Sequence, residues 1–418
     1  MNKKIFFRLD WLSILLYLLL VSFGLVNIYS SGFSNTTIVF WDPNYLVGKQ
    51  FWIFIACLII LPFVLAIKSN FFEHLTYIFY GVSIISLLGL FIFGQTVSGA
   101  TSWYSLGGFS LQPSEFAKIS TAMVVALNLS SFQNDLKKNT HLLKIILLVT
   151  LPMLLIILQP DAGSALVFMG IFFVLIREGL NLKFLFLAMG SLLIFLLTLL
   201  FSPLNLSLVM GFIFFILYIL IKRRYPKTKK SPFISTLIIG IVISYSVSFI
   251  FNTIFEQRHR DRFNIILGLE TDSRGIGYNI NQSKIAIGSG GFTGKGFLNG
   301  SQTKGNFVPE QETDYIFSIV GEEWGFLGSL TLILLFVILI IRIIYKAERH
   351  SSAYARVFSY TFASMLFVHF FVNIGMTLGL VPTVGIPLPF ISYGGSNLLA
   401  FSLMLFIYLN FDANRLNY

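Results

Sequence analysis

The chain has 418 residues, of which 56% are hydrophobic and only 11% charged, and its formal net charge is +11. This composition excludes the soluble globular class, in which about 25% of residues are charged. The lysines and arginines flank hydrophobic runs along the chain, a distribution typical of a membrane topology signal and not of a surface for nucleic acid.

A membrane-spanning helix needs about 20 apolar residues. The sequence predicts about twelve such helices, near residues 11–30, 51–67, 74–94, 115–133, 143–158, 161–177, 182–200, 204–221, 232–254, 314–342, 355–380 and 394–411. The first is too long for the core of a signal peptide and is expected to remain as an anchor. We therefore predict an all-α polytopic membrane protein with about 10–12 transmembrane helices, forming a single membrane domain over residues 1–418.

The basic residues orient these helices. A cytoplasmic N-terminus places the KRRYPKTKK run at residues 222–230 on the inner side, as the positive-inside rule requires. Both termini are then cytoplasmic, and the segments at 31–50, 95–114, 255–313 and 381–393 lie outside. The segment at about 255–313 is the largest extracytoplasmic loop.

This external loop is polar, rich in glycine and basic against the positive-inside trend. Asp272 follows Arg260 and Arg262 in the chain, and a carboxylate there could act as general base on a hydroxyl while arginines hold a phosphate-bearing leaving group. The arginines could instead pair with acidic residues of the loop. The alternative for Asp272 is an ordinary solvated turn in Asp-Ser-Arg-Gly.

Three further segments carry polar residues at the ends of predicted helices. Glu115 and Lys118 share one helix face, either as a structural pair or as a substrate contact. Asp161 lies in Gln-Pro-Asp-Ala-Gly and is either a helix cap or a ligand. Ser392 belongs to a proline- and glycine-rich segment over 381–396 that either lines a substrate groove or shapes a hairpin. The five histidines are scattered and predict no zinc cluster.

Six motifs occur in order along the chain. They are WxxLGxFxxQPSExAK at 103–118, QPDxG at 159–163, DxxGxGY at 272–278 followed by Gln282-Ser283, PExxTDxIF at 309–317, GEExGxxG at 321–328 and PxxGxPLPxISYGGS at 382–396. Together they resemble the SEDS family (shape, elongation, division, sporulation) across nearly the whole chain.

The resemblance implies a peptidoglycan glycosyltransferase that polymerises lipid II at the outer face of the bacterial cytoplasmic membrane. By the same matching Asp272 is the catalytic aspartate and Arg260 and Arg262 are basic residues before the loop, while Glu115 and Lys118 match a family pair. The other candidates for substrate binding are Gln282, Ser283, Asp161, Glu310, Asp314 and Ser392.

The resemblance also implies partners: a class B penicillin-binding protein, which is a transpeptidase, and other membrane proteins of the rod complex. A divalent cation (Mg or Mn) would help to neutralise a pyrophosphate, although the sequence reveals no ligand set. The QSKIAIGSGG and GKGF segments favour the elongation subfamily over the division subfamily. A lipid II flippase and a recruiting scaffold are the competing functions. The family usually has about ten spans, and the surplus here falls between 182 and 254.

Overall fold

The computed structural model describes residues 8–33, 39–97, 99–107, 109–131, 136, 138–227, 230–255, 257–269 and 275–415. These residues are mostly helical, which confirms the predicted fold class. The chain divides into two compact units, Met1–Gly179 with Tyr278–Tyr418, and Leu180–Gly277, and each is described by itself. The expectation of one membrane domain over residues 1–418 stays a prediction.

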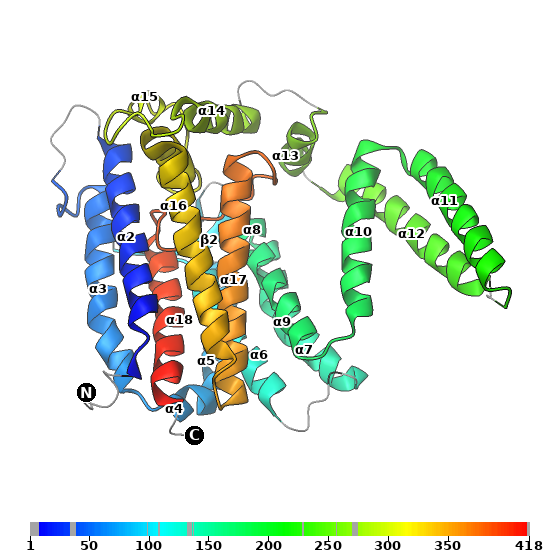
Figure 1. Ribbon diagram of the computed structural model, residues 1–418. Helices are drawn as coiled ribbons and strands as arrows, with labels where there is room; N and C mark the ends of the chain where they lie inside the picture. The colour runs from blue at the N-terminus through cyan, green and yellow to red at the C-terminus, as the bar shows by residue number, and fades with distance from the viewer. Residues whose placement is uncertain are drawn as a thin grey trace. The chain divides into compact units, whose positions relative to one another are not determined.

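The larger unit contains most of the helices and a small sheet. In its first part the elements are α2 (Trp11–Gly32), α3 (Leu46–Ala66), α4 (Ser69–His74), α5 (Thr76–Phe93), β1 (Gln95–Val97), β2 (Ala100–Leu106), β3 (Phe109–Leu111), α6 (Pro113–Ser130), α7 (Asn139–Leu158), α8 (Ala162–Val167), η1 (Phe168–Gly170) and α9 (Ile171–Arg177). In its second part they are α14 (Ile276–Ser289), α15 (Ser301–Lys304), α16 (Ile316–Ala347), α17 (Ala353–Thr377) and α18 (Gly395–Asn414), as Figure 1 shows.

All regular elements among the described residues of the smaller unit are helices. Its elements are α10 (Leu182–Leu200), α11 (Pro203–Arg224), α12 (Ser231–Phe249), the π-helical turn η2 (Ile250–Ile254) and α13 (Gln257–Ile266). Both α10 and α11 pack against α12. All three helices predicted in the surplus region therefore form.

Every predicted apolar segment coincides with a helix. Among the described residues, ten helices are long and apolar enough to cross a membrane. The other two predicted segments are α6, which carries Glu115 and Lys118, and the shorter α8–α9 run. Polar residues lower the hydropathy of α6, yet protein covers most of its length. The expected range of 10–12 is confirmed.

The core of the larger unit lies around α6, α17 and α18. In α17 and α18 the most apolar windows are 78% and 89% buried. Both helices carry serine, asparagine and other polar residues among their buried positions, and such groups avoid lipid because hydrocarbon offers them no hydrogen bonds. α6 packs against α5 and α17, and α3 packs against α18.

The sequence did not predict the small external sheet. Its strands lie in the order β1-β2-β3, with antiparallel pairs that include Gln95 with Trp103 and Tyr104 with Leu111. The Tyr104 hydroxyl donates to the Ser86 carbonyl, which lies within α5, seven residues before its end (2.8 Å). This bond holds β2 against the second half of α5, shortly before α6 begins.

The external segment between α14 and α15 is held against a kink in α16. The kink lies at Gly325, whose φ of 64° and ψ of −157° are strongly disfavoured for other residues. Backbone amides of Lys295 and Gly296 donate to the carbonyls of Glu322 and Glu323 (both 3.0 Å). A side chain at Gly290 would lie 1.9 Å from the Gly321 carbonyl oxygen, so only glycine permits this approach. The loop is thus anchored to a membrane helix.

Candidate functional site

A buried charged centre lies between α6 and α17. Lys118 is fully buried, and its ammonium donates to Glu115 Oε1 at 2.7 Å and to His369 Nε2 at 3.0 Å. An ammonium has no acceptor, so Nε2 of His369 must accept. Nδ1 then carries the proton and donates to the Pro387 carbonyl at 2.9 Å. The hydrogen bonds fix His369 as the neutral Nδ1–H tautomer.

The second carboxylate oxygen of Glu115 is also occupied. It accepts a hydrogen bond from Asn397 Nδ2 on α18 at 3.1 Å. The Phe401 ring packs edge-on against His369, with centroids 4.8 Å apart, and lies 5.6 Å from the Lys118 ammonium. The Lys118 charge is therefore paired with the Glu115 carboxylate, and both groups are hydrogen-bonded inside a site that excludes water. The predicted pairing of Glu115 with Lys118 is present, and it joins three helices and the 382–396 segment.

A second polar cluster adjoins the start of α6. Gln112 Nε2 donates to Asp161 Oδ2 (3.0 Å), and its backbone amide donates to Ser396 Oγ (3.0 Å). Asp161 Oδ1 accepts from the Ser164 amide at 3.0 Å, so Asp161 caps α8. The QPSE, QPD and GGS motifs, which are distant in the sequence, meet here.

The segment containing Ser392 is joined to the 309–314 motif. Ser392 Oγ accepts from the Leu388 amide (2.8 Å) and donates to the Thr313 carbonyl (2.5 Å). Asn373 on α17 donates to the carbonyls of Asp314 (2.9 Å) and Ile386 (2.8 Å). These bonds hold the broken backbone of 382–394 against protein, as irregular backbone at this depth requires.

Glu322 is a buried carboxylate with a full set of partners. It accepts five hydrogen bonds, from Lys295 Nζ, Ser301 Oγ, the Gln302 amide, the Thr303 amide and the Thr303 hydroxyl. The amide donors lie in the first turn of α15, where unpaired N–H groups favour an anion. Glu322 therefore caps α15 and fixes Lys295.

The remaining candidates of the larger unit differ in exposure. Ser283 on α14 is fully buried and donates to the Thr377 carbonyl at the end of α17 (2.9 Å). Gln282 and Asp314 are half-buried, and Glu310 is exposed and accepts from the Thr313 hydroxyl (3.2 Å). Ser283 is thus a docking contact between α14 and α17.

Asp272 lies outside the described residues. Arg260 and Arg262 are described within the smaller unit, on α13, where the Arg260 guanidinium donates to the Asn252 carbonyl in η2 (3.1 Å). Two residues along a helix correspond to a rotation of about 200°. Positions 260 and 262 therefore lie on different sides of α13, an arrangement that their spacing in an extended loop did not predict.

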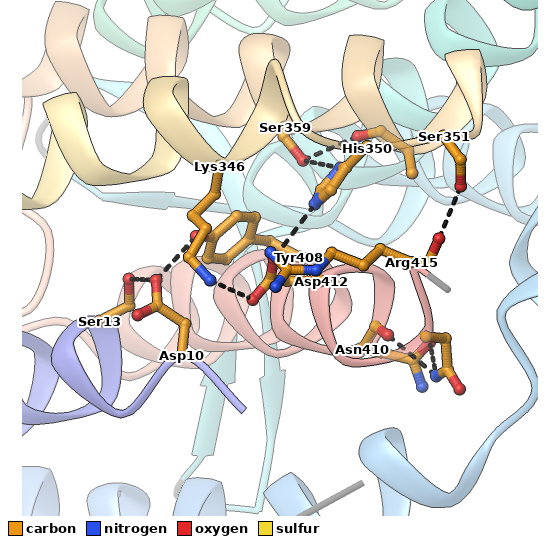
Figure 2. A network of polar contacts seen from close by, with 12 residues as sticks. Asp10, Ser13, Lys346, His350, Ser351, Ser359, Tyr408, Asn410, Asp412 and Arg415 are labelled. Atoms are coloured by element: carbon orange, nitrogen blue, oxygen red, sulfur yellow. Dashed lines mark hydrogen bonds and ion pairs between the residues drawn. The ribbon is translucent and has the colours of Figure 1, made fainter. Parts of the chain in front are cut away.

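A further charged cluster joins the inner ends of α2, α16 and α18 (Figure 2). Asp10 accepts from the Arg342 guanidinium (2.9 Å), the Ser13 hydroxyl (2.7 Å) and the Tyr408 hydroxyl (3.1 Å). Burial raises the pKa of Asp10, but hydrogen bonds from Arg342 and Ser13 and the charge of Lys346 outweigh it, so the net pKa is lowered. The carboxylate is the stable form in this cluster.

The same cluster extends to the turn between α16 and α17. Asp412 accepts from Lys346 Nζ (2.8 Å) and Arg415 Nη1 (3.1 Å), and His350 Nε2 lies 3.8 Å from Asp412 Oδ1. Burial lowers the pKa of His350, and the nearby Asp412 carboxylate opposes this only in part. The imidazole is therefore neutral near pH 7.

Sequence reasoning missed His369, Asn397, Asn373 and Glu322. A signal was available for His369 and Asn373, because each interrupts an apolar run in a predicted span and such residues usually face the protein interior. Within the described ranges, no group of three or more histidine, cysteine, aspartate or glutamate side chains is placed to hold a metal ion.

Comparison with known proteins gives consistent matches. The profile of the FtsW/RodA/SpoVE family, described as a cell cycle protein, matches residues 10–214 and 181–417. The chain is 35% identical to the peptidoglycan glycosyltransferase RodA of Treponema pallidum (strain Nichols), over 93% of this chain and 94% of that protein. It is 34% identical to the peptidoglycan glycosyltransferase MrdB of Escherichia coli (strain K12), over 82% of this chain and 79% of that protein. A solved chain of a peptidoglycan synthase complex superposes with a TM-score of 0.72 at 25% identity, over 97% of this chain and 98% of that one.

Proposed function

The chain belongs to the FtsW/RodA/SpoVE family, and we propose that within it the protein is a peptidoglycan glycosyltransferase of the elongation type, similar to RodA. Its substrate is lipid II, which it polymerises into glycan strands at the outer face of the bacterial cytoplasmic membrane. The observation that carries the proposal is the identity of 34–35% to the RodA and MrdB glycosyltransferases over most of the chain.

The proposed reaction uses the external loop. The acceptor hydroxyl oxygen bonds to the anomeric carbon of the donor, its proton passes to the Asp272 carboxylate, and the bond from that carbon to undecaprenyl pyrophosphate breaks. Arg260 and Arg262 offset the charge that develops on the leaving pyrophosphate. The assignment of Asp272 is supported by the DxxGxGY motif at 272–278.

In our proposal the buried centre of the larger unit has a structural role. Glu115, Lys118 and His369 use their hydrogen-bonding atoms on one another and on the protein around them. These contacts within the protein favour the structural-pair alternative over direct substrate contact. In our proposal Asp161, Ser283 and Ser392, which are likewise bonded within the protein, position the outer segments. The accessible Gln282, Glu310 and Asp314 are then the residues that contact substrate.

The depth of the buried centre does not favour a flippase. His369 lies eight residues before the outer end of α17, or about 12 Å. Lys118 lies five residues after the outer start of α6, or about 8 Å. A transporter usually places its ionisable residues near the midplane, within repeats related by symmetry. The charged residues here belong to the outer half, where a polymerase would act.

The proposed partners follow from the same family. A class B penicillin-binding protein would crosslink the strands, consistent with the solved relative from a complex that coordinates polymerization and crosslinking. Other rod-complex membrane proteins would complete the assembly. A divalent cation would neutralise pyrophosphate, but no described group of protein ligands fits one. No step of the proposed reaction therefore depends on a metal.

Two experiments test the proposal. Purified protein with its transpeptidase partner should convert lipid II into glycan strands, whereas a flippase would move labelled lipid II across vesicles without polymerising it. Depleting the protein from its own cells should distinguish the two polymerase types. Loss of elongation and rounding of the cells support the RodA type, while filaments that fail to divide would indicate the FtsW type.

A further inference from the structure

The connection between α11 and α12 carries a dense positive charge. Six of the nine residues from Lys222 to Lys230 are lysine or arginine. Residues 179–255 contain no aspartate or glutamate, so this stretch supplies no counter-charge of its own. A topology signal alone needs only a modest excess of basic residues near a span.

The five of these charges that the structure describes lie between the end of α11 and the start of α12. The rings of Tyr218 near the end of α11 and Phe233 near the start of α12 pack with centroids 5.5 Å apart, which holds the two helix ends together. Lys222 Nζ lies 5.6 Å from the Tyr218 ring centroid. The basic side chains described here are all exposed, and none of them forms a hydrogen bond or ion pair with another described residue: Lys222, Arg223, Arg224, Lys227 and Lys230.

The helices that lead to this cluster present apolar surface. In α10 and α11 only 6% of the most apolar window is buried, and the hydropathy of both is high. Acyl chains are the natural cover for such helices in a bilayer. The head groups of those same lipids then lie at the level of the basic cluster. Lysine and arginine stems reach toward such an interface while their charged ends bind phosphate.

We propose that the basic cluster formed by Lys222, Arg223, Arg224, Lys227 and Lys230 binds the head groups of anionic phospholipids in the inner leaflet. The ligand is a phosphodiester attached to acyl chains, which distinguishes it from free phosphate. Each lysine or arginine close to an anionic surface raises affinity about fivefold, and added salt weakens the effect. Removing three charges should therefore lower lipid selectivity by up to about 100-fold at low salt. The binding requires neither lipid II nor Asp272.

The test uses the full chain reconstituted in bilayers of phosphatidylcholine with a minority of phosphatidylglycerol. Spin-labelled versions of the two lipids report their relative association with the protein by electron paramagnetic resonance. The test variant carries Lys222→Gln, Arg223→Gln and Arg224→Gln together. Its control carries Lys68→Gln, Lys144→Gln and Lys183→Gln, which remove the same charge from exposed positions outside this cluster.

We expect the wild type and the control to prefer phosphatidylglycerol, and added salt to weaken this preference. In the test variant the preference for phosphatidylglycerol should be at least tenfold lower. Equal melting temperatures in pure phosphatidylcholine would show that all three proteins fold. A wild type without preference overturns the proposal. A test variant that keeps the preference also overturns the proposal. That result would favour an acidic protein partner as the ligand of the basic cluster. Inhibition by free phosphate without lipid selectivity would contradict the lipid assignment as well.

Discussion

The ammonium of Lys118 lies 3.0 Å from Nε2 of His369, although 251 positions separate the two residues in the chain. Because Lys118 also pairs with Glu115, one lysine links a local ion pair on α6 to the broken segment that follows α17. These contacts explain how α6 accommodates the buried charge of Lys118. They also make the position of the 382–394 segment dependent on the buried centre.

Removing the charge of Lys118 should destabilise the protein strongly. Lys118→Met leaves the Glu115 carboxylate buried without its cation, and breaking a buried pair costs about 3–5 kcal/mol. The double variant with Glu115→Gln should recover part of that loss, measured by denaturation in detergent. If Lys118→Met instead kept its melting temperature and lost only polymerase activity, the pair would be a substrate contact and not a structural lock.

The two bonds of His369 can be separated by size-matched substitutions. Glutamine can place an amide oxygen near the position of Nε2 and keep an acceptor for Lys118, whereas asparagine reaches only the Nδ1 position and keeps the donor for the Pro387 carbonyl. We expect His369→Gln to retain more stability than His369→Asn, because a buried ammonium N–H donor left without an acceptor costs more than an unpaired carbonyl. The reverse order of melting temperatures would contradict the assigned tautomer.

Gly290 and Gly288 provide a matched pair in the external segment. Gly290→Ala places a methyl group 1.9 Å from the Gly321 carbonyl oxygen, and overpacking of this kind costs about 1–3 kcal/mol. Gly288→Ala meets no atom within 4 Å. Hydrogen exchange over residues 290–305 should therefore accelerate only in Gly290→Ala, with reduced polymerase activity. Equal exchange in both variants would show that the loop is not anchored through this contact.

The inner cluster should make stability sensitive to mild acid. The pKa of His350 is lowered in the folded protein, so below about pH 6.5 the unfolded chain binds a proton that the folded chain resists. The stability that comes from the neutral His350 side chain is fully present above about pH 6.5 and is lost as pH falls toward the lowered pKa. Melting temperature should fall from pH 7 to 5 in the wild type and less in His350→Gln. An unchanged slope in the variant would assign the sensitivity to other groups.

The helices could be predicted from the sequence because apolar runs of span length carry a strong local signal. The Glu115–Lys118 pair could also be predicted, since residues three positions apart on a helix share a face. His369 and Asn397 could not be joined to it, because their contacts depend on how α17 and α18 pack against α6. The small sheet and the external helices escaped prediction for another reason: their short polar segments have little periodicity, and membrane-helix contacts hold them in place.

The most direct test of the proposed function is glycan-strand synthesis from lipid II by the purified protein with its transpeptidase partner, comparing the wild type with Asp272→Asn. Asp261→Asn is a suitable control, because this carboxylate on α13 accepts from Gln257 (2.7 Å) and has no proposed role in the reaction. We predict strands from the wild type and the control, and none from Asp272→Asn despite unchanged folding and partner binding. Full strand synthesis by Asp272→Asn would contradict the account.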